Sequence, residues 1–186
     1  MNRKRLLLVI DRDGTIIDND DFPGREADWR KNLKTNKGVI EFILYLQSMF
    51  EVTSIVVSNQ SGVARGYFDI QTVKDVNLYL EKTLKGNGIK IANWQFCPYV
   101  DKIYANKYPK IQLIDKWIKE KSKRKPSPEM VLDGLAELNK SIEDFESILV
   151  IGNRKDDSDL AKNLGARFID VTGKTSKELI DILAVV

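Results

Sequence analysis

The chain has 186 residues, of which 42% are hydrophobic and 31% charged, and its formal net charge is +3. These totals predict one globular domain over residues 1–186 and exclude a largely disordered chain. With no histidine and a single cysteine, Cys97, the chain excludes an internal disulfide, catalysis by a histidine base, and a Cys/His zinc site. No apolar run approaches the roughly 20 residues of a membrane helix, so we expect a cytoplasmic protein that does not contact membranes.

Apolar runs rich in β-branched residues alternate with amphipathic segments along the chain. In chain order the patterns predict a strand at 6–10, a helix at 37–50, a strand at 52–57, a helix at 70–85, a weaker strand at 89–96, a helix at 128–139, a strand at 148–151, a helix at 156–164, a strand at 166–171 and a helix at 176–184. Strands that are apolar throughout and alternate with helices indicate an α/β fold, with a five-stranded parallel sheet covered by helices on both faces.

Other local signals concern helix ends and the stretches between elements. Ser127 is the predicted N-cap of the helix at 128–139, with Pro128 at its first position. Thr175 and Glu178 have the spacing of a capping box. The stretches 19–36 and 98–124 are polar and irregular, and a short helix is predicted at about 110–121 within the second.

Polar clusters lie where the predicted strands end. The sequence DRDGT (residues 11–15) follows the first strand, SNQSG (58–62) follows the second, GNRKDD (152–157) follows the fourth, and KRKP (123–126) precedes the helix at 128–139. Ligands of parallel α/β sheets bind at the carboxyl ends of the strands, so we expect these clusters to converge. Carboxylates, a hydroxyl, amides and cations together suit phosphoryl transfer, which needs a nucleophile, charge neutralisation and a proton for the leaving oxygen.

These motifs, in this order, resemble those of phosphatases of the haloacid dehalogenase (HAD) superfamily. DRDGT resembles the first motif, SNQSG the second, Lys125 the third and GNRKDD the fourth, over residues 6–165. Together, DRDGT, SNQSGVARG and RKPSP are similar to the small branch that contains heptose-bisphosphate and histidinol-phosphate phosphatases, with polynucleotide 3'-phosphatases as more distant relatives. The resemblance implies a Rossmann-like HAD core with little or no cap.

The resemblance also implies roles for single residues. Asp11 would be the nucleophile and Asp13 the general acid–base, while Ser58 and Lys125 would bind the transferring phosphate. Three further residues would face phosphate or substrate: Asn59, Arg124 and Arg65, the last of which could instead only cap a loop. Arg12 is expected to be a positioning or a surface residue.

A magnesium site is implied by the same resemblance. Asp11, the backbone carbonyl of Asp13 and Asn153 would hold Mg²⁺, with Asp157 next to the ligands. The chain departs from the family at Asn153, where aspartate is usual; an amide oxygen can ligate Mg²⁺, but one negative charge is lost. It also lacks the zinc loop that usually precedes RKP in the heptose and histidinol enzymes, so no zinc is expected and Cys97 is interpreted as a buried apolar residue.

The function predicted from these observations is Mg²⁺-dependent hydrolysis of a phosphomonoester through an aspartyl-phosphate. A phosphorylated sugar or another small metabolite is the preferred substrate. A polynucleotide 3'-phosphatase is the first alternative, because the stretch 98–124 is basic and bears aromatic residues. The second alternative is a binding or regulatory protein with weakened turnover, suggested by Asn153. The sequence gives no indication of the oligomeric state.

Overall fold

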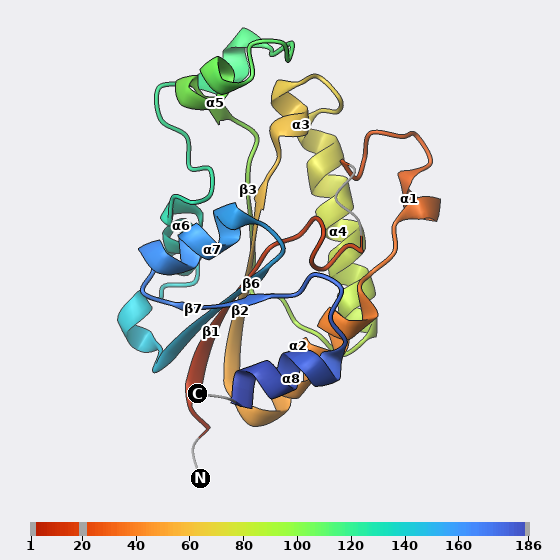
Figure 1. Cartoon of the computed structure of the whole chain (residues 1–186). Coiled ribbons are helices and arrows are strands. Elements are labelled where there is room, and N and C mark those ends of the chain that lie inside the picture. Colours follow the sequence, from red (N-terminus) through yellow and green to blue (C-terminus); the bar gives the residue numbers. More distant parts are fainter. Residues whose placement is uncertain (1–2, 19–21, 185–186) are drawn as a thin grey trace.

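The computed structural model describes residues 3–18 and 22–184, and its centre is a five-stranded parallel sheet with the order β3-β2-β1-β6-β7 (Figure 1). The strands are β1 (Arg5–Ile10), β2 (Glu51–Asn59), β3 (Asn93–Cys97), β6 (Ser147–Gly152) and β7 (Arg167–Asp170). Strand β1 pairs with β2 on one side and with β6 on the other. The chain therefore changes direction across the sheet at β1, the point where open α/β sheets bind their ligands. The predicted parallel sheet is confirmed.

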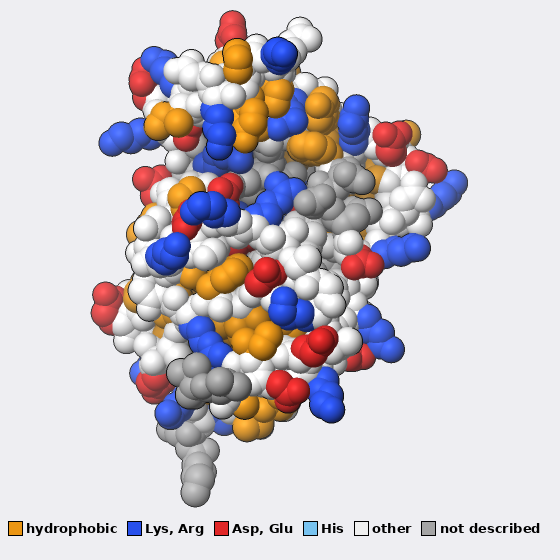
Figure 2. Space-filling model, viewed as in Figure 1, with side chains coloured by type: hydrophobic (Ala, Val, Ile, Leu, Met, Phe, Trp, Pro, Cys, Tyr) orange, Lys and Arg blue, Asp and Glu red, His pale blue; other side chains and the backbone are white. Residues whose placement is uncertain are grey.

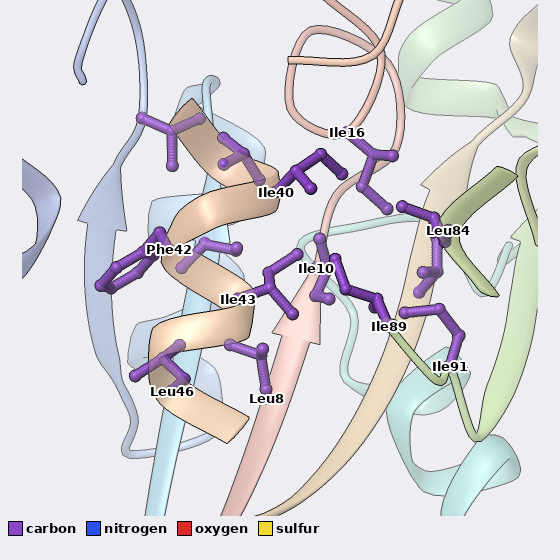
Figure 3. Close-up of a cluster of buried hydrophobic side chains, with 14 of the residues drawn as sticks. Leu8, Ile10, Ile16, Ile40, Phe42, Ile43, Leu46, Leu84, Ile89 and Ile91 are labelled. Carbon is purple, nitrogen blue, oxygen red and sulfur yellow. The ribbon is translucent and has the colours of Figure 1, made fainter. Parts of the chain in front are cut away.

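Helices cover both faces of the sheet (Figure 1). One layer consists of α2 (Lys37–Met49), α4 (Ile70–Gly86) and α8 (Ser176–Ala184), and the other of α6 (Glu129–Glu137) and α7 (Lys155–Asn163). Alternate residues of β1 supply the two cores: Leu8 and Ile10 face the first layer, whereas Leu7 and Val9 face the second. Figure 3 shows the first core, in which Ile43 and its neighbours on α2 meet β1. Each such side chain contributes about 1.5–3 kcal/mol on burial.

A small lobe lies at the carboxyl edge of the sheet, and we call residues 98–124 the mini-cap. It contains the two-stranded sheet β4 (Val100–Asp101) and β5 (Ile118–Lys119), the helix α5 (Lys102–Lys107) and the 3₁₀ turn η1 (Asp115–Trp117). The helix predicted at 110–121 is wrong, because the pairing with β4 holds 118 and 119 in an extended conformation and the helix begins earlier. Asp101 caps α5 by accepting a hydrogen bond from the Tyr104 backbone N–H at 2.7 Å.

The remaining elements are short. They are α1 (Trp29–Asn32), α3 (Ser61–Ala64) and the 3₁₀ turn η2 (Ile142–Asp144). The irregular stretch predicted at 19–36 contains α1, and its first three residues, 19–21, lie outside the described residues. Figure 2 shows hydrophobic and basic side chains next to one another at the end of the molecule where α5 lies. Of the helices within 3–18 and 22–184, none has the length and apolar character needed to cross a membrane.

Two predicted helix ends can be compared with the structure. The predicted N-cap Ser127 is wrong by one residue, because α6 starts at Glu129 and Pro128 is the residue before it. The Ser127 hydroxyl still accepts a hydrogen bond from the Glu129 N–H at 3.4 Å. The capping box of α8 is confirmed: the Thr175 N–H donates to Glu178 Oε2 at 2.8 Å, and the Glu178 N–H donates to Thr175 Oγ1 at 3.4 Å.

Candidate active site

A polar cavity of about 290 Å³ opens at the carboxyl edge of the sheet, beneath the mini-cap. The strand-end clusters converge on it, as the sequence predicted. The lining includes these predicted site residues: Asp11, Asp13, Ser58, Asn59, Arg65, Arg124, Lys125 and Asp157. Asn153 is not among the lining residues, and its side chain lies against Gly14. Cys97 is buried and free, as expected of a small apolar residue.

The floor of the cavity is a buried cluster of two carboxylates and one ammonium group. Lys125 Nζ donates hydrogen bonds to Asp11 Oδ1, to Asp157 Oδ1 at 2.6 Å and to the carbonyl oxygen of Val57 at 3.1 Å. The Asp11 and Lys125 residues are only 5% and 4% exposed. The lysine therefore has a fixed position next to the predicted nucleophile.

The surroundings of Asp11 raise the pKa of its carboxyl group. Burial raises the pKa of Asp11 to about 6, against the opposing effect of Lys125, and the Asp157 and Asp13 carboxylates add to the increase. Burial alone would lower the pKa of Lys125, but the Asp11 and Asp157 carboxylates outweigh it and raise that pKa above its ordinary value. The lysine is thus cationic at neutral pH, and it compensates for part of the negative charge at the cavity floor.

Asp157 organises the loop between β6 and α7. Its Oδ2 accepts hydrogen bonds from the backbone N–H groups of Asn153 at 3.2 Å and Arg154 at 3.0 Å. A Cβ atom at Gly152 would lie 2.4 Å from the Asp157 carboxyl group, so only glycine permits this approach. Asp157 therefore orients both Lys125 and the loop that carries Asn153.

The oxygen atoms around Asn153 suit a hard divalent cation. Asn153 Oδ1 is buried and has no hydrogen-bond partner among the described residues. Its side chain touches the turn after β1, where Gly14 has φ +82° and a Cβ would lie 2.2 Å from Asn153 Nδ2. Within residues 3–18 and 22–184, no group of three or more Asp, Glu, Cys or His side chains could hold a metal ion. A cation here would thus use Asp11 together with amide and backbone oxygens, ligands that Mg²⁺ accepts.

Asn59 is tied to the backbone of Lys125. Its Oδ1 accepts from the Lys125 N–H at 2.8 Å, and its Nδ2 donates to the Lys125 carbonyl at 3.2 Å and to Asp156 Oδ2 at 3.4 Å. It lines the cavity, yet both polar atoms of its amide are engaged within the protein. Ser58 is 2% exposed and accepts a hydrogen bond from Gln60 Nε2 at 2.7 Å.

The mouth of the cavity is built from arginine and aromatic side chains. Arg65 donates a hydrogen bond to the Tyr104 hydroxyl, and its guanidinium lies 5.2 Å from the centre of the Phe22 ring. On the other side, the Arg124 guanidinium lies 4.7 Å from the centre of the Tyr104 ring, which in turn contacts Tyr108. Arg65 Nε and Arg124 Nη1 are buried without a hydrogen-bond partner in the described part of the chain. Both arginines also line the cavity, so each brings a positive charge to its mouth.

Several lining residues were not predicted from the sequence, namely Phe22, Gln60, Ser61, Tyr104, Tyr108, Arg154 and Asp156. Gln60 and Ser61 belong to the SNQSG motif, so their position after β2 was a usable signal. Of the tyrosines in 98–124, Tyr99 packs against Trp117, whereas Tyr104 and Tyr108 line the cavity. Arg12 is completely buried and contacts Asp13, so of the two roles expected for it, positioning or surface, the surface role is excluded.

The comparisons with known proteins agree with these motifs. Residues 122–183 match a family model described as HAD-hydrolase-like. The chain is 29% identical over 169 residues to the D-glycero-beta-D-manno-heptose-1,7-bisphosphate 7-phosphatase of Photorhabdus laumondii, covering 90% of this chain and 81% of that protein. It is 30% identical over 173 residues to a Thermoplasma acidophilum protein named "Probable D-glycero-D-manno-heptose-1,7-bisphosphate 7-phosphatase", covering 90% of each. The histidine biosynthesis bifunctional protein HisB of Campylobacter jejuni is 28% identical over 176 residues, which are 43% of its length.

Solved structures show the same fold. A HAD-like phosphatase from Mesorhizobium loti superposes with a TM-score of 0.74 at 23% identity, covering 99% of this chain and 87% of that one. The D,D-heptose 1,7-bisphosphate phosphatase from B. bronchiseptica, solved with magnesium and phosphate, gives a TM-score of 0.67 at 22% identity, with 97% and 87% covered. With the relatives and the motif order, these matches lead to one conclusion: the chain is a phosphatase of the HAD superfamily and belongs to the family that contains the heptose-1,7-bisphosphate 7-phosphatases.

Proposed function

We propose that the protein hydrolyses a phosphomonoester of a small metabolite, such as a phosphorylated sugar, through a phosphorylated Asp11 and with Mg²⁺ as cofactor. The observation that carries the proposal is the arrangement at the cavity floor. Asp11 lines the cavity beside Ser58, with Lys125 fixed on its Oδ1 and Asp13 two residues further along the chain. A nucleophile, a phosphate-binding cation and a second carboxylate for proton transfer are thus adjacent.

The two half-reactions follow from this arrangement. An Asp11 carboxylate oxygen attacks phosphorus, and the bond from phosphorus to the leaving oxygen breaks. The leaving oxygen keeps the electron pair of that bond and takes a proton from the Asp13 carboxyl group. Water then attacks the phosphorus, gives a proton to the Asp13 carboxylate, and the bond to Asp11 breaks to restore its carboxylate. The sum is an alcohol and inorganic phosphate from the monoester and water. Lys125 and Ser58 would bind the phosphoryl oxygens during both steps.

Asp11, the Asp13 carbonyl and Asn153 would hold Mg²⁺ beside this arrangement. When bound it would neutralise charge on the phosphoryl oxygens and align the phosphate with Asp11. The unpartnered buried Oδ1 of Asn153 supports this placement. The magnesium in the B. bronchiseptica structure is a finding on that protein and supports the same choice of ion.

A small substrate suits the size and lining of the cavity. Its volume of about 290 Å³ lies just below the usual range for ligand pockets, roughly 300–1,000 Å³. Arg65 and Arg124, which line the cavity, would bind oxygen atoms of the leaving group. The names of the relatives from Photorhabdus laumondii and Thermoplasma acidophilum support a phosphorylated sugar.

A polynucleotide 3'-phosphate is the second candidate substrate. It is favoured by Tyr108, which lines the cavity, is 39% exposed and has the Lys107 ammonium group 5.5 Å from its ring centre. Bases stack on exposed aromatic rings, and lysines bind the backbone. Binding of a 3'-phosphorylated oligonucleotide that falls steeply with added salt would select this candidate, whereas no binding at low salt would eliminate it.

Phosphate release tests the proposed chemistry. The substrates are heptose and hexose bisphosphates, histidinol phosphate, nucleotides and the 3'-phosphorylated oligonucleotide, each with Mg²⁺ and with EDTA. We expect Mg²⁺-dependent release from at least one sugar phosphate, and none from the Asp11→Asn variant. Release that persists in Asp11→Asn, or that is equal in EDTA, would contradict the proposal.

A further inference from the structure

Arg12 is a buried cation that directs two of its nitrogen atoms to one carboxylate, that of Asp13. Its exposed fraction is 0%, although long charged side chains are rarely fully buried. Nε donates to Asp13 Oδ1 at 2.7 Å and Nη2 donates to Asp13 Oδ2 at 3.0 Å. The pair is therefore bidentate, the arrangement in which arginine fixes both the position and the plane of a carboxylate.

Arg12 is itself held from the far side. Its Nη1 donates to Asn77 Oδ1 at 2.8 Å, across 65 positions of sequence, and Asn77 is a buried residue of α4. An isolated buried guanidinium would be strongly destabilising, so both partners are needed to keep it inside the protein. The Asn77 contact joins the guanidinium to a long helix, which prevents it from following Asp13 if that side chain rotates.

A second residue completes the contacts of Asp13. Gln60 Nε2 donates to Asp13 Oδ2 at 2.6 Å, and the same nitrogen lies 2.7 Å from Ser58 Oγ. Asp13 lines the cavity, and its side chain is 17% exposed. Both of its oxygens thus accept hydrogen bonds from fixed donors, while one side of the carboxyl group stays open to a substrate.

We propose that Arg12, anchored by Asn77, is a positioning residue that sets the direction of the Asp13 carboxyl group for proton transfer to the leaving oxygen. A general acid must come within about 2.6–3.2 Å of that oxygen, and an error of 1 Å can cost on the order of 100-fold in rate. The inference rests on the proposed function in one respect, the role of Asp13 as the proton donor. If Arg12 served only the stability of the turn, its loss would affect all substrates equally.

Leaving groups of different basicity separate these two roles. Phenyl phosphate and p-nitrophenyl phosphate are close in shape. Phenolate is the more basic leaving group, so its departure depends on a proton donor much more than the departure of p-nitrophenolate does. The ratio of their kcat/KM values, p-nitrophenyl over phenyl, therefore reports proton donation in the first half-reaction. The variants are Arg12→Gln, Arg12→Lys and Asn77→Leu, with Asp13→Asn as the reference. Ser54→Ala is the control, because Ser54 is buried in β2 and does not line the cavity.

The inference predicts a graded change in this ratio. Asp13→Asn should raise it by about 100-fold, within the usual range for a general acid. Arg12→Gln should raise it at least tenfold, through kcat for phenyl phosphate with KM changed less than threefold. Arg12→Lys, which can contact only one carboxylate oxygen, should lie between Arg12→Gln and wild type. Asn77→Leu should raise the ratio about threefold, and Ser54→Ala should leave it unchanged.

Two results would overturn the inference: the first would leave the proposed function intact, and the second would contradict both. If Asp13→Asn raises the ratio but Arg12→Gln and Asn77→Leu lower both rates in parallel, Arg12 is structural and only this inference fails. If Asp13→Asn leaves the ratio unchanged, the proposed function fails at Asp13 and the inference with it. Melting temperatures show which variants are folded; if Arg12→Gln is not, the ratio for Asn77→Leu decides.

Discussion

Lys125 Nζ and Asp157 Oδ1 lie 2.6 Å apart in a pair whose side chains are only 3% and 2% exposed. Asp157 also binds the backbone of the loop that carries Asn153, and Lys125 also binds Asp11. One buried ion pair thus joins the predicted nucleophile to the predicted metal-ligand loop. Removing either partner leaves an uncompensated charge in the protein interior.

Lys125→Met should destabilise the protein as well as inactivate it. The methionine has a similar length, but the Asp11 and Asp157 carboxylates would lose their shared cation. We expect the free energy of unfolding to fall by about 3–5 kcal/mol, measured by urea denaturation. Lys123→Met is the matched control, because the exposed Lys123 pairs with Asp133 at the surface, and it should change stability by less than about 1 kcal/mol. Equal effects of the two variants would contradict this account of the cluster.

Asp11→Asn should stabilise the metal-free protein in a pH-dependent way. The pKa of Asp11 is raised from 3.8 to about 6, chiefly by burial. Between these values the folded protein keeps a proton that the unfolded chain has lost, so Asp11 lowers the free energy of unfolding as pH rises through this window. The advantage of Asp11→Asn over wild type should therefore grow from about pH 4 to about pH 6, by up to about 3 kcal/mol, and then level off.

Urea denaturation in EDTA from pH 4 to pH 7 measures that advantage, since EDTA removes any bound divalent cation. Ser54→Ala serves as the control, because it replaces a buried polar residue without changing charge. A stability difference between Asp11→Asn and wild type that stays constant with pH would show that Asp11 ionises normally in the fold.

Asn153→Asp should bind Mg²⁺ more tightly. The substitution restores a negative charge next to Asp11, and carboxylate charge is a main determinant of affinity for hard cations; we expect about a tenfold lower Kd. Calorimetric titration with Mg²⁺ measures this without substrate, and the Mg²⁺ dependence of phosphate release provides a second measurement. Asp156→Asn, three residues further along the chain in the first turn of α7 and at the cavity wall, should leave Mg²⁺ affinity within about twofold of wild type. Unchanged affinity in Asn153→Asp would place the cation elsewhere.

Tyr104→Ala should weaken substrate binding more than catalysis. The ring lies between Arg65 and Arg124 and holds both in place through contact with their guanidinium groups. Losing it should raise KM for the best substrate about 3–10-fold, the effect of roughly 0.7–1.4 kcal/mol, with kcat within about twofold of wild type. Ile103→Ala on the same helix is the control, since Ile103 is 79% exposed. A selective loss of kcat in Tyr104→Ala would mean that the ring acts in the chemical step.

The sheet and its helices could be predicted because their sequence signals are local. Runs such as Leu6–Ile10 are too apolar for an exposed strand, and the Thr175–Glu178 pair marks a helix start by itself. The mini-cap could not be predicted in the same way. Its helix begins at a local N-cap, Asp101, but its small sheet depends on the pairing of Val100 with Ile118, which lie 18 positions apart in the sequence.

The same distinction holds in the site. Asp11 and Ser58 follow from motifs at strand ends, and Lys125 from a motif just before a helix, so the topology of the sheet brings them together. The burial of Arg12 follows instead from Asn77, 65 positions away on a helix. No pattern around DRDGT distinguishes a buried arginine from an exposed one. The direction of Tyr104 into the cavity likewise depends on Arg65 and Arg124, which the mini-cap brings to the same ring.

Trapping the phosphorylated enzyme tests the central claim most directly. The protein is mixed with its best substrate and Mg²⁺, quenched in acid, and treated with borohydride, which reduces an acyl phosphate to an alcohol but leaves a free carboxylate intact. Peptide mass spectrometry should find the reduced side chain at Asp11, absent without substrate and absent in Asp11→Asn. Active protein that turns over substrate but shows no reduced Asp11 at any quench time, or shows reduction at another carboxylate, would contradict Asp11 as the nucleophile.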